Sequence, residues 1–139
     1  MNAQLTHLAL QVANPDECVA FYESYCNMNV IHDRASKDKR VVWLASPGQE
    51  ARFVIVLLPG GSGKQQPASD FSHLGFALDS AAAVDAVAEK ARAAGILIWD
   101  PVQEPYPVGY YCGVRDPDGN FVEFSFGQPV GIDKTQNRG

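Results

Sequence analysis

The sequence contains no apolar run near the roughly 18 residues that a membrane-spanning helix needs, so we expect no membrane partner. Residues 1–4 lack the positive charge and the apolar stretch with which a secretory signal peptide begins. Basic residues are scarce as well: 11 Lys and Arg stand against 16 Asp and Glu, for a net charge of −5. Nucleic acid is therefore not expected as a partner, because phosphate binding needs clustered basic side chains.

Cysteine is also sparse. Cys18, Cys26 and Cys112 form no CxxC motif, and their odd number leaves at least one outside any disulfide. A reducing, cytoplasmic location is the simpler interpretation, with the cysteines acting as small buried hydrophobic residues. The 139 residues are 46% hydrophobic and 19% charged, a balance that supports a buried core. The length suits one compact domain or two very small ones.

The same order of strand and helix signals occurs twice along the chain. Residues 5–13 alternate between apolar and polar side chains as a strand does, and residues 71–79 repeat that alternation. His7 and His73 occupy matching positions in these two segments. A chain built from two such repeats is expected to place matching residues in matching structural surroundings.

A helix is predicted after each of these strands. Asn14 offers an N-cap to residues 15–27, and Asp79 or Ser80 can cap a helix that runs through about residue 94. Three more strand-like segments follow each helix, at residues 29–34, 40–46 and 51–58 in the first half and 96–99, 109–115 and 120–126 in the second.

We therefore predict an α+β fold in which two β-α-β-β-β modules, residues 1–58 and 71–127, pack as one structural domain with a curled mixed sheet. Residues 59–70 are predicted to be a linker, because their glycine-rich sequence lacks the spacing of a phosphate-binding loop. Residues 128–139 are polar and are predicted to form a loose tail.

Three residues form a candidate metal-ligand set. His7 and His73 would converge if the two sheets curl around a shared cavity. Glu123 lies in a strongly apolar strand, between Val122 and Phe124, where a carboxylate is costly to bury unless it is paired or bound to a metal. The alternative is a solvent-facing position on an edge strand. Two imidazoles and a carboxylate form the facial triad of non-haem Fe(II) sites, with coordination positions left open; Fe, Mn, Ni and Zn all stay possible.

The chain resembles the vicinal oxygen chelate superfamily in four segments: Thr6-His7-Leu-Ala-Leu-Gln-Val, Cys18-Val-Ala-Phe-Tyr22, His73-Leu-Gly-Phe-Ala and Asp116-Pro-Asp-Gly-Asn-Phe-Val-Glu123. This superfamily includes glyoxalase I, fosfomycin-resistance enzymes, methylmalonyl-CoA epimerase, extradiol ring-cleavage dioxygenases and bleomycin-resistance proteins. The resemblance covers about residues 5–127 and implies paired modules around a metal site. It also implies His7, His73 and Glu123 as ligands, and a homodimer whose two chains can share the site.

Departures from the family patterns narrow the choice among the reactions that the family catalyses. Glyoxalase I typically adds a fourth ligand in the last strand of the first half, where this chain has Ile55 or Val56. The missing group disfavours glyoxalase I and the epimerase. Fosfomycin enzymes place a Thr two residues after the first His and an Arg some nine residues past the Glu, where this chain has Ala9 and Ile132. A phosphonate dianion would be poorly held without those groups.

Extradiol dioxygenases usually keep a Tyr at the position that aligns with Gly113, and Tyr111 on the same face of the strand could substitute for it. Other aromatic residues could line a pocket for a planar substrate or belong to the core, with both interpretations open. The aromatic candidates are Trp43, Trp99, Tyr106, Tyr110 and Tyr111.

The predicted function is a metal-dependent enzyme of glyoxalase or dioxygenase type, acting on a small molecule that chelates the metal through two oxygens. The three-ligand set slightly favours a dioxygenase over a lyase or isomerase. The alternative is a non-catalytic drug-binding protein of the bleomycin-resistance branch, which usually lacks the triad. A purely structural or regulatory dimer would need the matched residues by coincidence. A homodimer is expected in every case, because each sheet needs a partner face.

Overall fold

The computed structural model describes residues 1–36 and 39–131. Ile132, which stands where fosfomycin enzymes have an Arg, lies outside the described residues. The chain divides into two compact units, Met1–Lys64 and Gln65–Gly139. Each unit is described by itself below. Neither helix in the described part of the chain has the length and apolarity needed to cross a membrane.

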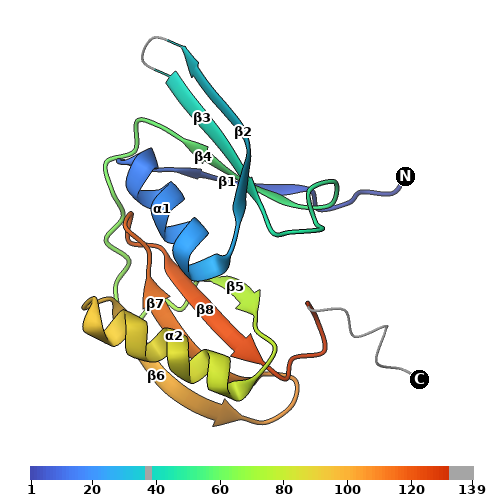
Figure 1. Cartoon of the computed structure of the whole chain (residues 1–139), viewed down its shortest axis with the longest axis vertical. Helices are drawn as coiled ribbons and strands as arrows, with labels where there is room; N and C mark the ends of the chain where they lie inside the picture. Colours follow the sequence, from blue (N-terminus) through green and yellow to red (C-terminus); the bar gives the residue numbers. More distant parts are fainter. Residues whose placement is uncertain (37–38, 132–139) are drawn as a thin grey trace. The chain divides into compact units, whose positions relative to one another are not determined.

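The first unit has one helix and a four-stranded sheet (Figure 1). Its elements are β1 (His7–Gln11), α1 (Pro15–Cys26), β2 (Asn29–Ser36), β3 (Lys39–Ala45) and β4 (Val54–Leu58). The strand order is β1-β4-β3-β2, and β1 runs parallel to β4 while the other pairs are antiparallel. Parallel pairing of β1 with β4 brings the start of the unit beside its end.

Helix α1 begins where the sequence predicts. The Asn14 side chain accepts a hydrogen bond from the backbone N–H of Glu17 at 3.1 Å, which satisfies one of the free donors of the first turn. Cys18, Phe21 and Tyr22 form its buried side, which packs against β3 and β4. This apolar side fixes which face of the first sheet is covered by the helix.

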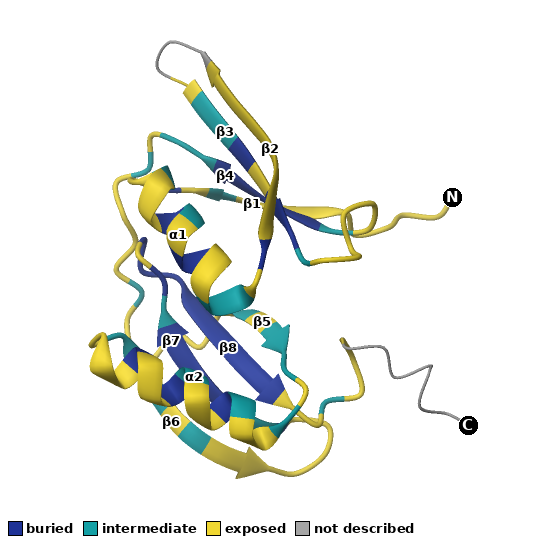
Figure 2. Ribbon diagram, in the orientation of Figure 1, coloured by how far each residue is buried: buried dark blue, intermediate teal, exposed yellow. Residues whose placement is uncertain are grey.

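The second unit repeats the pattern. Its elements are β5 (Leu74–Ala77), α2 (Ala81–Ala93), β6 (Leu97–Glu104), β7 (Gly109–Arg115) and β8 (Phe121–Phe126). The strand order is β5-β8-β7-β6, with β5 parallel to β8. Val84, Ala88 and Ala91 of α2 are buried, as are most residues of the central strands β7 and β8 (Figure 2).

The α+β class and the two β-α-β-β-β modules are confirmed, and neither sheet closes on itself. The largest boundary error concerns the strand predicted over 96–99, which extends to Glu104 in the structure. Pro101 lies within this strand. It is tolerated because β6 is an edge strand whose register shifts between Trp99 and Val102.

The start of the predicted linker is held against the end of β1. The backbone N–H of Gly61 donates to the Val12 carbonyl at 3.1 Å, and Lys64 Nζ donates to the Gln11 carbonyl at 3.1 Å. A Cβ atom at Gly61 would lie 2.7 Å from that Gln11 oxygen, so only glycine allows this approach. These contacts tie the last residues of the first unit to its first strand.

The N-cap of α1 provides a test of the local fold. We expect Asn14→Ala to lower the free energy of unfolding by about 1 kcal/mol, because the N–H of Glu17 loses its acceptor. Asn14→Asp keeps an acceptor at the same place and is expected to stay near wild type. Urea unfolding followed by circular dichroism measures both. Equal losses in the two variants would contradict the capping role.

Candidate metal centre

The centre is built around Glu123, in the middle of the sheet of the second unit. Strand β8 lies between β5 and β7, and Glu123 is paired with Gly75 on one side and Gly113 on the other. The residue is only 7% exposed. Because Gly75 has no side chain, the carboxylate has room on the β5 side of its strand. A Cβ atom at Gly75 would reach Glu123 Oε2 at 3.7 Å, an ordinary contact.

Trp99 of β6 fills the space above Gly113. A Cβ atom at Gly113 would lie 2.1 Å from Cε3 of the Trp99 ring, so any larger residue there would displace the indole. The ring centroid of Trp99 lies 5.6 Å from His73, 6.4 Å from Tyr111 and 5.6 Å from Phe121, each in an edge-to-face arrangement. Trp99 therefore packs His73 from one side and closes the position where a ring-cleaving enzyme usually has its Tyr.

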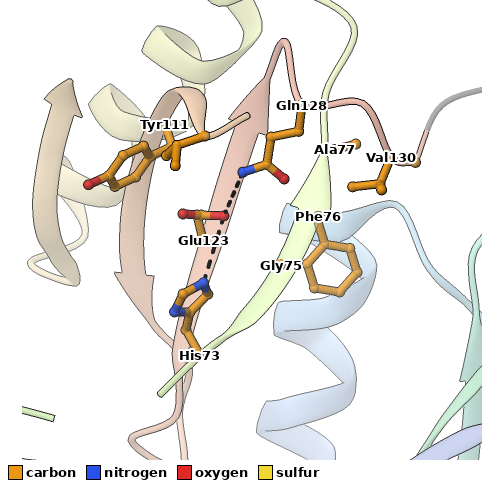
Figure 3. Close-up of a pocket in the computed structure, with 10 residues that line it drawn as sticks. His73, Gly75, Phe76, Ala77, Tyr111, Glu123, Gln128 and Val130 are labelled. Atoms are coloured by element: carbon orange, nitrogen blue, oxygen red, sulfur yellow. Dashed lines mark hydrogen bonds and ion pairs between the residues drawn. The ribbon is translucent and has the colours of Figure 1, made fainter. Parts of the chain in front are cut away.

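His73 comes directly before β5 and points toward Glu123 (Figure 3). Its Nδ1 lies 2.6 Å from the Phe71 carbonyl oxygen. A carbonyl can only accept, so Nδ1 carries a proton, and in the neutral imidazole Nε2 holds the lone pair. His73 Nε2 lies 3.8 Å from Glu123 Oε2. This is the orientation of an imidazole prepared to bind a metal through Nε2.

The loop before His73 is fixed by its own hydrogen bonds. Gln66 Nε2 donates to the carbonyls of Asp70 and Ser72 at 2.6 and 2.7 Å. The Ser72 N–H donates to Asp70 Oδ1 at 3.0 Å, and hydrogen bonds from Ser72 lower the pKa of the Asp70 carboxyl. The Phe71 carbonyl, which orients the imidazole of His73, is thus held between two bonded residues.

The distance between His73 and Glu123 fits a shared metal ion. Metal–nitrogen and metal–oxygen bonds of about 2.1 Å each add to roughly 4.2 Å, the largest separation that one ion can bridge. The observed 3.8 Å is shorter. An acceptor-only carboxylate beside an unprotonated imidazole nitrogen is a donor set for a divalent cation.

A cavity of about 680 Å³ opens beside this pair (Figure 3). We call it the Glu123 cavity. Its polar lining comprises His73, Tyr111, Glu123 and Gln128, and its larger apolar residues are Phe76, Val108 and Val130. Gln128 Nε2 donates to Glu123 Oε2 at 3.4 Å. No lysine or arginine is among the lining residues in the described part of the chain.

Tyr111 and Tyr110 lie on opposite faces of β7. Tyr111 lines the Glu123 cavity, and burial, followed by the charges of Glu104 and Glu123, raises the pKa of its phenol. The hydroxyl stays protonated at neutral pH and can donate a hydrogen bond or a proton. Tyr110 instead donates to Asp85 of α2, so the structure does not bring this predicted pocket residue to the cavity.

His7 and Trp43 belong to the first unit. His7 begins β1 opposite Val54, and its Nδ1 lies 3.0 Å from Thr6 Oγ1. Trp43 of β3 is 41% exposed, and its ring centroid lies 5.8 Å from that of His32. Within residues 1–36 and 39–131, no three His, Cys, Asp or Glu side chains gather as a metal-binding group. His7 lies in the first unit, whereas His73 and Glu123 lie in the second.

The registers of the two sheets settle which residue of the first unit corresponds to Glu123. Leu8 pairs with Ile55 as Leu74 pairs with Val122, so Val56 is the counterpart of Glu123. Val56 is buried and cannot bind a metal. Of the two positions expected for a fourth ligand, the structure thus selects Val56 and offers no donor there.

Sequence reasoning missed two features of the centre. A glycine inside a strand signals close approach of another group, so Gly113 could have indicated the packing of Trp99. Gln128 carried no comparable signal, since it follows the last strand in a segment that reads as a polar tail. Only the turn after β8 returns it to the carboxylate.

Comparisons with known proteins agree with this architecture. Residues 4–124 match the family described as the Glyoxalase/Bleomycin resistance protein/Dioxygenase superfamily. The chain is 59% identical over 131 residues to the uncharacterized protein PA2024 of Pseudomonas aeruginosa, and the match covers 94% of each chain. The resemblance to the vicinal oxygen chelate superfamily is confirmed by the family match and by solved structures.

These structures include the fosfomycin resistance protein FosX from Listeria monocytogenes. One gives a TM-score of 0.73 at 20% identity and covers 93% of this chain and 97% of that one. A FosX variant complexed with Mn(II) and 1S,2S-dihydroxypropylphosphonic acid gives a TM-score of 0.68 at 20% identity, and the match covers 99% of this chain and 100% of that one. A glyoxalase I variant from Zea mays gives 0.68 at 19% identity over 87% of this chain and 43% of that one. These likenesses establish the fold.

The two glycines beside Glu123 make a matched pair of tests. We expect Gly113→Ala to destabilise the fold by about 1–3 kcal/mol, because its Cβ collides with the Trp99 ring. Gly75→Ala makes only an ordinary contact and is expected to leave stability within about 0.5 kcal/mol or to raise it. Urea unfolding measures both, and Trp99 fluorescence in a Trp43→Phe background reports the ring. An unshifted Trp99 spectrum in Gly113→Ala would contradict the packing.

The raised pKa of Tyr111 is also testable. The difference in absorbance at alkaline pH between wild type and Tyr111→Phe isolates this phenol. We expect its midpoint above pH 10, because burial and nearby carboxylates oppose ionisation. In urea the midpoint should return to about 10. Its contribution to stability is therefore complete below pH 10 and is lost as the pH rises through the folded-state pKa. A folded-state midpoint at or below 10 would refute this environment.

Proposed function

The chain belongs to the Glyoxalase/Bleomycin resistance protein/Dioxygenase superfamily, and from this premise we propose that it is a metal-dependent enzyme. Its substrate is a small molecule that chelates the metal through two oxygen atoms. The observation that carries the proposal is the pair formed by His73 Nε2 and Glu123 Oε2, 3.8 Å apart beside the Glu123 cavity.

His7 is the proposed third ligand. It holds the position in the first module that His73 holds in the second, and its Nδ1 contacts Thr6 Oγ1, which leaves Nε2 as the ligand nitrogen. It comes from the other unit, either of the same chain or of a second copy in a homodimer. Open edges at β1, β2, β5 and β6 support such pairing. Analytical ultracentrifugation measures the mass in solution. A mass equal to that of one chain would exclude the homodimer, and His7 would then have to come from the same chain.

The donor set suits Fe, Mn, Ni or Zn as divalent ions. Mn(II) in the complex of the related FosX variant supports a divalent metal. When bound, the ion supplies a Lewis acid for the substrate oxygens or, if it is Fe(II), a centre for oxygen chemistry. Two imidazoles and one carboxylate leave coordination positions for the substrate and a further ligand.

The residues of the chain favour oxygen chemistry over isomerisation. An isomerase would need a second carboxylate to move a proton at carbon, and the counterpart of Glu123 is Val56. Tyr111 supports oxygen chemistry instead, because its protonated hydroxyl lines the cavity and can donate a hydrogen bond to a substrate oxygen. Phe76, Val108 and Val130 bind the apolar body of the substrate and exclude water.

The decisive measurement is the metal content of the purified protein by elemental analysis. We expect about one ion per chain in the wild type and a loss of at least tenfold in affinity in His73→Ala and Glu123→Gln, because each removes a ligand atom. His7→Ala is expected to behave in the same way. His32→Ala is the matched control, since His32 lies in β2 opposite Trp43 and is not one of the proposed ligands.

Two other outcomes would redirect the assignment. If wild type holds no metal even after incubation with divalent ions, the ligand set is wrong. Tight binding of a planar drug that survives His7→Ala would then favour the non-catalytic, bleomycin-resistance type of function. If metal binds but an Fe(II)-loaded preparation consumes no oxygen with catechols, ring cleavage is excluded and Lewis-acid chemistry remains.

A further inference from the structure

We infer that Gln128 is a positioning residue of the proposed metal centre: its side-chain amide holds the Glu123 carboxylate in the orientation that binds the ion. The inference rests on the proposed metal site and adds a residue to it. Gln128 Nε2 lies 3.4 Å from Glu123 Oε2, the same oxygen that lies 3.8 Å from His73 Nε2 (Figure 3).

The Glu123 carboxylate is buried but has few hydrogen-bonding or charged partners among the described residues. Among the described residues, Gln128 is the one group that donates a hydrogen bond to it, and His73 is the one group within ion-pair distance. Glu123 is 7% exposed, so water cannot solvate it freely. A buried charge without such partners is strongly disfavoured. The amide thus compensates the carboxylate before any ion arrives.

The backbone brings Gln128 to this place through close glycine contacts. Gly127 has a φ of 97°, a conformation that turns the chain back after β8. A Cβ atom at Gly131 would lie 2.6 Å from Ala77 Cβ, so the end of the segment 127–131 lies directly against β5. Gln128 and Val130 of this segment form part of the wall of the Glu123 cavity.

The chemistry of the pair also fixes which way the amide faces. A carboxylate only accepts, so the NH2 group of Gln128 must point to Glu123. With this donor on Oε2, the carboxylate is restrained from rotating away from His73. Hydrogen bonds that orient a metal-binding side chain are typically worth 10–100-fold in metal affinity.

Two substitutions at Gln128 should act in opposite directions. Gln128→Leu keeps the size and loses the donor, and we expect its dissociation constant for Co²⁺ to rise about tenfold. Gln128→Glu keeps the length and places a second anionic oxygen beside the ion, and we expect a dissociation constant lower than that of wild type by about threefold or more.

The experiment is a Co²⁺ titration of the full chain, freed of metal with a chelator and followed by visible absorption. Gln103→Leu is the matched control, because the Gln103 amide donates to the Glu104 backbone on exposed β6. Thermal unfolding of the metal-free proteins is recorded in parallel. Both Gln128 variants should melt lower than Gln103→Leu, since Glu123 loses its donor or gains a like charge.

The possible results separate this inference from the proposed function. If wild type binds Co²⁺, His73→Ala does not, and both Gln128 variants match Gln103→Leu, the inference on Gln128 is overturned while the metal site stands. If Gln128→Leu binds Co²⁺ as tightly as Gln103→Leu, the inference also fails, whatever the affinity of Gln128→Glu. If wild type binds no Co²⁺, the metal site itself is refuted and the inference with it.

Discussion

A single carboxylate in the middle of a sheet determines most of the second unit. Strand β8 has Val122 and Phe124 fully buried on the side of α2, and its alternation places Glu123 on the other side. Removing a carboxylate from water costs several kcal/mol unless partners replace the solvent. Gly75 gives it space, Gly113 admits the Trp99 ring beside it, and His73 and Gln128 are its partners. The residues around β8 therefore accommodate the single buried carboxylate of Glu123.

The partners of this charge are themselves held in place, which is what a binding centre requires. Trp99 packs edge-on against His73 and is locked above Gly113. On the other side of the imidazole, the Phe71 carbonyl accepts from Nδ1. The histidine is thus constrained in tautomer and in ring orientation without a bound ion. Such preorganisation reduces the ordering cost when a ligand binds.

Much of this arrangement could be predicted from the sequence, because it depends on short-range periodicity. Strand alternation, the Asn14 cap and the repeat of His7 at His73 gave the two modules and placed Glu123 on the same face as Ser125. Alternation also places Tyr110 and Tyr111 on opposite faces of β7, so only one of them can face the cavity. Gln128 depends on a turn after the last strand, which no period encodes. The participation of His7 stays a prediction, since it lies in the other unit.

The two modules share a backbone pattern but differ at the position that decides their chemistry. Glu123 lies between Gly75 and Gly113, whereas its counterpart Val56 lies between Ala9 and Trp43. A carboxylate at both positions would give a histidine–carboxylate pair in each sheet, and hence two sites per chain. With valine in the first sheet, each chain supplies two matched histidines and one carboxylate. In the proposed function, that set would provide the ligands of one centre per chain.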